Sequence, residues 1–188
     1  MRKSWRSSAL PFVESRRASD SAACYAPHSH STLSIGAVDG GESVFSRNGQ
    51  RQKLVRGDVV LIPAGEVHSC NPADDGRWSY QMLYLDPAWV SRILREFLGE
   101  FPGEFDAPHS GIDCRPQPKL PGAALYARLT EMTRALFGPA SDEDKEACLL
   151  GFVGDVFAAE KARTLHPAVA GDSAPGRVKE LIAAHYRE

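Results

Sequence analysis

The spacing of apolar and polar residues gives the two halves of the chain different characters. From about residue 22 to residue 85, short apolar runs are separated by turn signals rich in Gly, Asn and Asp. These signals recur roughly every ten residues, and they span residues 38–41, 47–50, 56–58 and 72–76. This spacing predicts an all-β sandwich or barrel. The run Val59-Val60-Leu61-Ile62 is apolar on both faces and predicts a strand buried on both sides.

Helical periodicity begins after Asp86-Pro87 and predicts helices over residues 87–97, 121–137 and 142 to about 163. The last two carry apolar stripes formed by Leu125, Leu129, Met132 and Leu136, and by Leu149, Phe152, Val153 and Val156. The third helix opens on Ser141-Asp142-Glu143-Asp144, which resembles a capping box. Two amphipathic helices joined by a short turn predict an antiparallel hairpin.

Segments rich in Pro, Gly and small residues separate these elements. Residues 99–120 are expected to form an irregular connector, and residues 166–176 a linker. Residues 177–188 then place Val178, Leu181, Ile182 and His185 on one face of a helix, where the sequence ends. A helix this short is marginal alone in water, so we expect it to begin a second domain that the sequence does not include.

Composition narrows the classes of function. The 188 residues hold 22 Lys and Arg against 24 Asp and Glu, which gives a net charge of -2 and no overall basic field for nucleic acid. Only residues 1–20 lean basic, and they are expected to form a solvated N-terminal arm. The four cysteines form no CxxC pair, and the sequence shows neither a secretory signal nor a membrane-spanning run. We therefore expect a cytoplasmic protein without membrane attachment.

The candidate chemistry centres on three histidines. If His28 and His30 lie on one strand, side-chain alternation puts them on the same face as Thr32, Ser34 and Gly36, whereas Leu33, Ile35 and Ala37 take the other face. The polar face is expected to point into the barrel, where a later strand returns His68, and the apolar face to lie beneath the helices. Buried polar groups need partners, so this interior should hold water, a ligand or a metal.

Two interpretations of the histidines stay open. Three imidazoles can hold zinc or another divalent transition metal, with Cys70, on the same face of its strand as His68, as a candidate fourth ligand. Alternatively, the imidazoles hydrogen-bond an effector or ordered water. No cysteine has an oriented base that would mark it as a nucleophile, and no residue is predicted to be catalytic.

The motifs resemble those of a known family. Gly57-Asp58-Val59-Val60-Leu61-Ile62-Pro63-Ala64-Gly65-Glu66-Val67-His68 resembles the second motif of the cupin barrels, and His28-x-His30 resembles the opening of the first. Metalloenzymes of that superfamily usually carry a Glu four or five residues after the second His, where this chain has Ser34 and Ile35. The resemblance implies a mainly β fold with C-terminal α: a cupin-like (double-stranded β-helix) barrel followed by an antiparallel helical hairpin.

The order of barrel, hairpin, connector and final helix resembles the regulatory half of AraC-family transcription regulators. That resemblance implies an effector-binding barrel with its first helix at residues 21–98, a dimerisation hairpin at 121–165 and the start of a truncated helix-turn-helix domain at 177–188. It also implies that the arm closes over the ligand, that the protein is a homodimer, and that DNA is bound only through the missing domain.

Position by position, the resemblance places Cys70, Tyr80 and Met82 in the effector pocket. Together with the polar face described above, the predicted ligand-binding residues are His28, His30, Ser34, His68, Cys70, Tyr80 and Met82. The expected function is ligand sensing and dimerisation in an AraC-like regulator that is not an enzyme. The alternative is a metal-dependent cupin enzyme, a dioxygenase or isomerase, in which an ion held by the histidines acts as a Lewis acid or activates oxygen.

Overall fold

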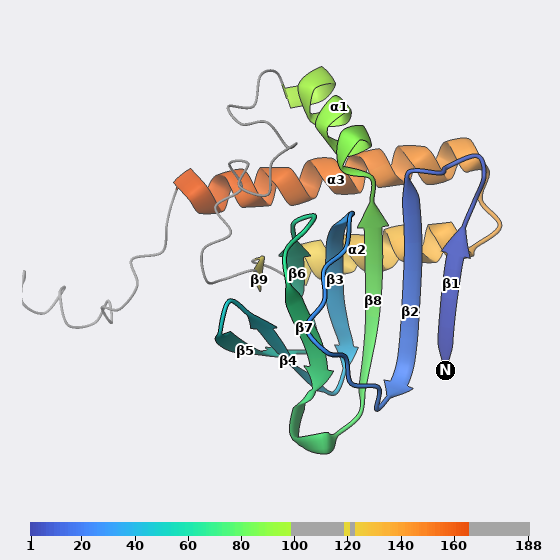
Figure 1. The fold of residues 1–188 in the computed structure, drawn as a ribbon. Helices are drawn as coiled ribbons and strands as arrows, with labels where there is room; N and C mark the ends of the chain where they lie inside the picture. The colour runs from blue at the N-terminus through green and yellow to red at the C-terminus, as the bar shows by residue number, and fades with distance from the viewer. Residues whose placement is uncertain (99–118, 121–122, 166–188) are drawn as a thin grey trace, which may run out of the picture.

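Two antiparallel sheets and a layer of helices make up the protein (Figure 1). The computed structural model describes residues 1–98, 119–120 and 123–165. Six strands form the larger sheet, in the order β1 (Arg2–Arg6), β2 (Val13–Ser21), β8 (Trp78–Leu85), β3 (Leu33–Gly40), β6 (Val59–Ile62) and β9 (Lys119–Leu120). Three strands form the smaller sheet, in the order β5 (Gln50–Val55), β4 (Glu42–Arg47) and β7 (His68–Pro72).

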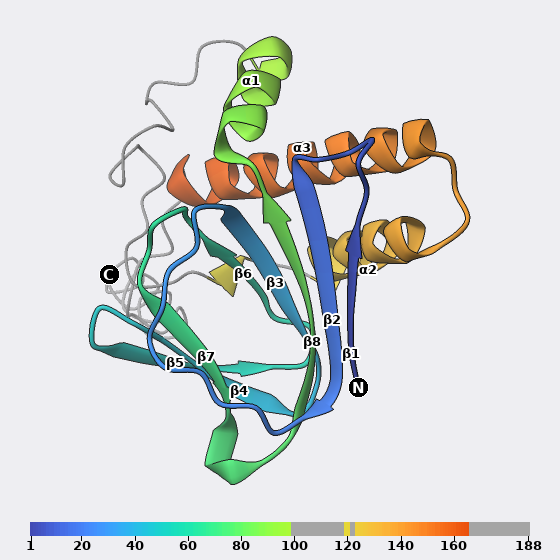
Figure 2. The same ribbon diagram turned by 45° about the vertical axis from the view of Figure 1, so that its right-hand side comes forward.

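Helices cover one face of the larger sheet, and the smaller sheet faces the other (Figure 2). The helices are α1 (Pro87–Leu98), α2 (Ala123–Phe137) and α3 (Asp142–Leu165), and a 3-10 turn, η1 (Ala73–Asp75), precedes β8. In the described residues, no helix is both long enough and apolar enough to cross a membrane. The predicted fold class, a mainly β cupin-like barrel with a C-terminal antiparallel helical hairpin, is confirmed.

The apolar residues divide into two clusters, one on each face of the larger sheet. The first packs the sheet against the helices, and it includes Leu33, Ile35, Ala37, Leu83, Leu85, Leu129, Phe152 and Val156. The second lies between the two sheets, and it includes Ala18, Val38, Phe45, Leu54, Val60, Ile62, Trp78 and Tyr80. The prediction that residues 33, 35 and 37 lie beneath the helices is therefore confirmed. The stripes of α2 and α3 are buried in this way within the chain itself.

Local sequence explains where several elements begin and turn. Asn48 and Gly49 have φ angles of 48° and 75° and join β4 to β5, as expected for an Asn-Gly hairpin. Asp86 accepts a hydrogen bond from the N–H of Trp89 at 2.8 Å, and Ser141 accepts one from Asp144 at 3.1 Å. These side chains cap the first turns of α1 and α3, so the N-cap half of the capping-box-like start predicted at Ser141 is confirmed.

Residues 1–20 differ from the prediction. They were expected to form a solvated arm ahead of the barrel, but they hold β1 and most of β2, and β2 pairs with β8 in the middle of the larger sheet. The reason for the error is that the buried residues of β2 are small or sparse, Val13, Ser15 and Ala18, while charged residues occupy the alternate positions.

The strand expected to carry both His28 and Ser34 is also interrupted. His28 makes an isolated bridge to His68, and β3 begins only at Leu33, so residues 29–32 separate the two. Most of the predicted connector lies outside the described residues, apart from β9 at Lys119–Leu120. The predicted linker at 166–176 and the helix at 177–188 lie outside them as well.

Candidate functional site

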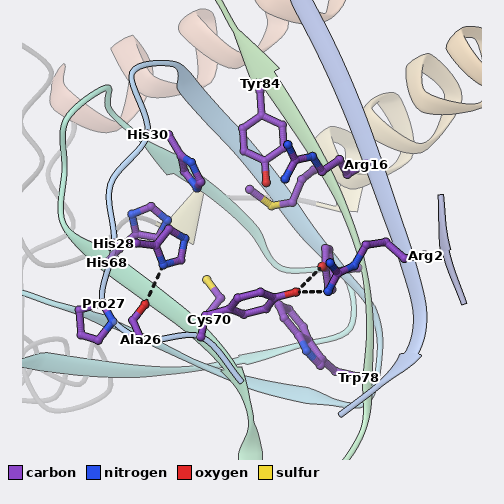
Figure 3. Close-up of a pocket in the computed structure, with 13 residues that line it drawn as sticks. Arg2, Arg16, Ala26, Pro27, His28, His30, His68, Cys70, Trp78 and Tyr84 are labelled. Carbon is purple, nitrogen blue, oxygen red and sulfur yellow. Dashed lines mark hydrogen bonds between the residues drawn. The ribbon is translucent and has the colours of Figure 1, made fainter. Parts of the chain in front are cut away.

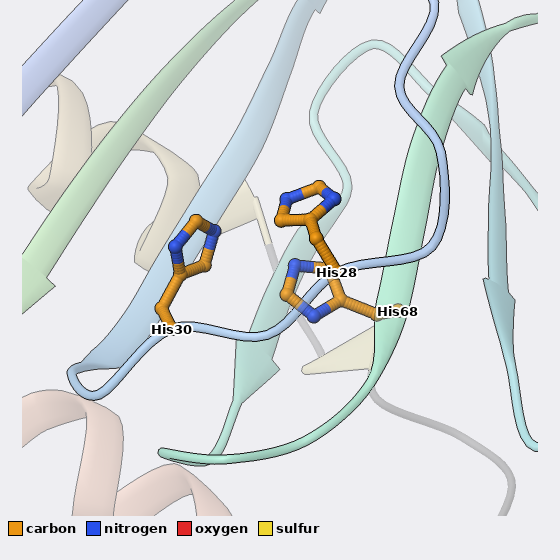
Figure 4. Close-up of side chains that lie close together, drawn as sticks. All are labelled: His28, His30 and His68. Carbon is orange, nitrogen blue, oxygen red and sulfur yellow. The ribbon is translucent and has the colours of Figure 1, made fainter.

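Three histidines converge in the space between the sheets (Figure 4). His28 and His68 are paired across an antiparallel bridge, and each backbone N–H donates to the other residue's carbonyl oxygen at 2.9 Å. The ring centroids are 4.9 Å apart for His28 and His30, 4.9 Å for His28 and His68, and 5.4 Å for His30 and His68. Their candidate ligand nitrogens all lie within 4.8 Å of one another, so one ion or one ligand group could contact all three.

Backbone carbonyls orient two of these rings. The Nδ1 of His28 lies 2.8 Å from the carbonyl oxygen of Ala26, and the Nδ1 of His68 lies 2.8 Å from that of Glu66. A carbonyl oxygen only accepts hydrogen bonds, so each Nδ1 must carry the hydrogen. In the neutral ring, Nε2 is then the nitrogen with a free lone pair, which is the form that binds a metal or accepts a proton from a ligand.

Burial favours the neutral form of His68 and His30. Removal from water lowers the pKa of His68 below its ordinary value, and His28 adds to this effect. The pKa of His30 is lowered by burial and then by the neighbouring His68 and His28, with a smaller contribution from Arg16. Close rings cannot easily carry charge together, so a charge on one neighbour makes protonation of His30 or His68 less favourable.

The imidazoles form one wall of a cavity of about 460 Å³ between the two sheets (Figure 3). A volume of this order suits a small organic molecule. The cavity is lined by Arg2, Arg16, Tyr25, Ala26, Pro27, His28, His30, His68, Cys70, Trp78, Tyr80, Met82 and Tyr84. The lining thus combines aromatic rings with a few polar groups, the usual composition of ligand pockets.

Six of the seven predicted ligand-binding residues line this cavity, and the seventh, Ser34, does not. Tyr80 also lies 3.3 Å from Tyr25, oxygen to oxygen. Cys70 is not a member of the group of metal-ligand atoms that the histidines form. Burial raises the pKa of its thiol to about 12, which disfavours the thiolate that a metal binds.

Neither of the two positions at which a carboxylate is usual supplies one here. Ile35 is fully buried in the core under the helices. Ser34 is fully buried as well, and within the described part of the chain its hydroxyl has no hydrogen-bond partner. The histidines therefore have no carboxylate from either position.

Sequence reasoning missed two cavity residues on the first strands, Arg2 and Arg16. Arg16 lies on β2, and its guanidinium carbon is 4.9 Å from the centre of the Tyr84 ring. Arg2 lies on β1 and donates a hydrogen bond of 2.6 Å to the hydroxyl of Tyr25. The signal that could have found them was the alternation of residues 13–18, which the expectation of a solvated arm concealed.

One carboxylate, that of Glu14, is shared by two arginines. Glu14 pairs with Arg16 at 2.5 Å and also with Arg6. Partial burial acts to raise the pKa of Glu14, but the hydrogen bonds from Arg16 and Arg6 outweigh it and hold the pKa below its ordinary value. The three side chains together keep a net positive charge beside the cavity.

A polar cluster connects the cavity strand β8 to helix α2. Gln81 lies between two cavity residues and points the other way, where its amide donates to Asp39 at 2.8 Å and to Thr130 at 2.9 Å. The Tyr126 hydroxyl donates to the same Asp39 oxygen at 3.1 Å. A shift of β8 at the cavity would therefore be felt directly by α2.

The chain was compared with known proteins. A family model described as the AraC-like ligand binding domain matches residues 13–153. No match was found among curated proteins.

Several solved structures resemble parts of the chain. A cupin superfamily protein from Desulfitobacterium hafniense is 20% identical over 45% of this chain and 77% of its own, with a TM-score of 0.36. A cupin 2 conserved barrel domain protein from Salinispora arenicola is 22% identical over 48% and 79%, with a TM-score of 0.39. The protein KdgF from a Halomonas species is 21% identical over 45% and 76%, with a TM-score of 0.38.

Proposed function

We propose that this chain, which belongs to the family of AraC-like ligand-binding domains, senses a small-molecule effector bound in the cavity between its two sheets. The observation that carries this proposal is the cavity itself: about 460 Å³, with aromatic walls and a limited set of polar groups. Ligand-binding domains need such a site, because apolar walls supply most of the binding energy while a few polar atoms fix orientation. Six of the residues predicted to bind ligand contribute to its lining.

A thermal-shift screen of small metabolites tests this proposal, since a molecule that binds only the native state raises the midpoint of unfolding. Each hit is then measured on Met82→Trp, which fills the cavity, and on Val67→Trp, which adds the same ring at a residue that is 54% exposed. We expect the hit to be lost in the first variant and retained in the second. Equal loss in both, or a screen without hits, would contradict effector binding in this cavity.

We further place the domain in an AraC-like, DNA-binding transcription regulator that acts as a homodimer through the α2–α3 hairpin. The polar cluster around Gln81 and Asp39 supports this part, because it ties a strand of the effector cavity to α2. Since the apolar stripes of the hairpin are buried in the chain, the interface between copies would use other residues of these helices.

The test uses the complete product of the parent gene. We expect specific DNA binding that weakens with salt, an effector-dependent change in that binding, and a dimer by sedimentation. A monomer at micromolar concentration, or a complete gene product without DNA affinity, would count against the regulator assignment and leave the effector site unaffected.

The histidine cluster favours a second candidate function, a metal-dependent enzyme of the dioxygenase or isomerase type. The geometry suits a metal, because three ligand atoms converge and two rings are already oriented by backbone carbonyls. His28, His30 and His68 would hold the ion, which would supply Lewis-acid chemistry when bound. The chain's own contribution would be to orient two of these rings through backbone carbonyls and to enclose the substrate among aromatic side chains.

Elemental analysis of protein purified without chelator, followed by zinc and iron titrations, tests this candidate. We expect stoichiometric metal in the native protein and its loss in the His28→Ala, His30→Ala double variant. Cys24→Ser, at an exposed cysteine, serves as a control that should keep the metal. Substoichiometric metal in the native protein, with no affinity change in the double variant, would remove the basis for an enzyme.

A further inference from the structure

The charges that line the cavity are all of one sign. Of the described residues around it, Arg2 and Arg16 carry fixed positive charge, and none is Asp or Glu. Glu14 approaches from outside the lining, but it is already shared between Arg6 and Arg16. Because Glu14 also pairs with Arg6, it offsets the charge of Arg16 only in part, and Arg2 adds a second positive charge to the lining.

Arg16 is held in a position from which it can meet a ligand. Its Nε takes the bond to Glu14 at 2.5 Å, and its guanidinium lies over the Tyr84 ring, with 4.9 Å from guanidinium carbon to ring centre. The bond through Nε leaves the two terminal nitrogens outside that contact. A guanidinium fixed in this way is preorganised for a planar, singly charged oxyanion such as a carboxylate.

Tyr84 lies between this cation and the imidazoles. Its ring centroid is 5.2 Å from that of His30, so the three groups follow one another along the wall of the cavity (Figure 3). The imidazoles offer ring nitrogens and Arg16 offers a charged guanidinium, so the two polar ends of the cavity are chemically different. A ligand that bridges them would place its anionic group at Arg16 and a neutral donor or acceptor at the histidines.

The remaining walls are flat and aromatic. Trp78 and Tyr80 have ring centroids 4.4 Å apart, and Tyr25 approaches Tyr80 through its hydroxyl. Arg2 completes this side by donating to Tyr25 and by lying 5.9 Å from the centre of its ring. Aromatic walls favour a ring or a conjugated chain, because the flat apolar face of such a ligand can stack on these side chains.

We propose that the effector of this cavity is an aromatic or conjugated organic acid with one carboxylate, which Arg16 binds through its terminal nitrogens while the body of the molecule packs among Tyr84, Trp78 and Tyr80. This inference rests on the proposed effector-binding function and specifies the chemical class of the effector. A neutral ligand would leave the terminal nitrogens of Arg16, which the bond to Glu14 does not use, without the anionic acceptor that a carboxylate supplies.

The experiment pairs each acid with a neutral molecule of the same shape. The probes are cinnamate, 4-hydroxycinnamate, indole-3-acetate and 2-naphthoate, each beside its primary amide, measured by calorimetry and thermal shift on chelator-treated protein. Removing metal ensures that a preference for acids does not arise from an ion at the histidines. We expect at least one acid to bind and its amide to bind about ten- to a hundredfold more weakly.

Three variants locate the charge that is responsible. Arg16→Gln should abolish the preference for acid over amide, while Arg17→Gln removes one charge from the same strand at an exposed residue outside the cavity and should keep it. Glu14→Gln releases Arg16 from its ion pair and should strengthen acid binding. Melting curves of the free variants verify that each is folded, and Glu14→Gln gives a gain of binding that misfolding could not imitate.

The possible results distinguish a wrong ligand class from the absence of effector binding. Amides that bind as well as their acids, or acids whose preference survives Arg16→Gln, would overturn the charge assignment and leave effector binding in place. Acids that bind only when zinc is restored would overturn it as well, since the carboxylate would then be a metal ligand. Failure of every acid and amide, when other metabolites bind in the cavity, would refute the ligand class, and absence of any ligand would refute the function itself.

Discussion

The two faces of the larger sheet differ although the same strands build both. On β8, Leu83 and Leu85 point to the helices and are fully buried, while Met82 and Tyr84 point to the cavity and keep some exposure. One face is packed with aliphatic side chains against α1, α2 and α3, whereas the other carries arginine, histidine and aromatic rings around open space. Adjacent positions thus serve stability and recognition separately, because side chains alternate across a sheet.

Gln81 is the exception that joins the two faces. It belongs to the helix face and is fully buried, yet it is polar and bonds to Asp39 and Thr130. Its neighbours on β8, Tyr80 and Met82, line the cavity. The two faces therefore differ most in how closely their side chains pack. They differ least at Gln81, where a change in the cavity could reach α2.

The largest expected effect comes from removing packing on the helix face. Leu83→Ala should reduce the free energy of unfolding by about 2–5 kcal/mol, because it leaves a void in a closed core. Met82→Ala should cost clearly less, because Met82 borders the existing cavity. Urea denaturation of the two variants measures the difference, and equal losses would mean that the cavity face is packed as tightly as the helix face.

The next effect concerns the buried amide that links the faces. Gln81→Leu should reduce the free energy of unfolding by about 1–3 kcal/mol, because Asp39 and Thr130 lose a partner inside the protein. Gln50→Leu, at an exposed position of β5, is the matched control and should change stability little. In a double-mutant cycle with Thr130→Val, the changes in the free energy of unfolding should be non-additive. Strict additivity would argue against an interaction between Gln81 and Thr130.

Gly36→Ala should alter the cavity with little change in stability. A methyl group at residue 36 would lie 2.2 Å from the sulfur of Met82, which is the flexible end of its side chain and can move into the cavity. We expect a cavity ligand to bind about tenfold more weakly, as measured by calorimetry. The double variant Gly36→Ala, Met82→Ala should recover the affinity, and a failure to recover it would place the damage in the backbone instead.

The smallest effect is a dependence of stability on pH in chelator-treated protein. Burial lowers the pKa of His68 and His30 below the ordinary value of 6.5, so the unfolded chain takes up protons at these residues before the folded chain does. The free energy of unfolding should therefore fall as the pH drops through 6.5 toward the lower folded-state pKa, and these groups should have no effect well above pH 7. Thermal melts from pH 7.5 to pH 5.5 measure it, and His68→Gln should flatten the profile.

Much of this contrast can be predicted from the sequence, because turn residues and alternation are local signals. Asn48 and Gly49 determine a hairpin by their own backbone preferences, and the run from Val59 to Ile62 indicates a strand that is buried on both faces. The histidines could be brought together because their motifs resemble a known pattern. These signals are enough to predict the barrel and the wall of the cavity that the histidines form.

The opposite wall was missed for a physical reason. Arg2 and Arg16 enter the cavity only because β2 pairs with β8, and this pairing between distant segments leaves little trace in the sequence of β2. Alternation correctly placed Ser34 on the cavity side of β3, where it pairs with Tyr84, but the break at residues 29–32 separates it from His28 and His30. The alternation of residues 13–18 marks a half-buried strand, but the pairing of that strand with β8 depends on contacts between residues far apart in the chain.

The single bridge between His28 and His68 makes two backbone amides useful reporters. Each amide hydrogen is bonded to the other residue's carbonyl, and on either side of His28 the chain is outside any strand. Hydrogen–deuterium exchange at these two amides would therefore register how often the segment lifts away from β7. If a compound slows this exchange, it stabilises the contact between the His28 segment and β7. This can be recognised even before the binding position of the compound is known.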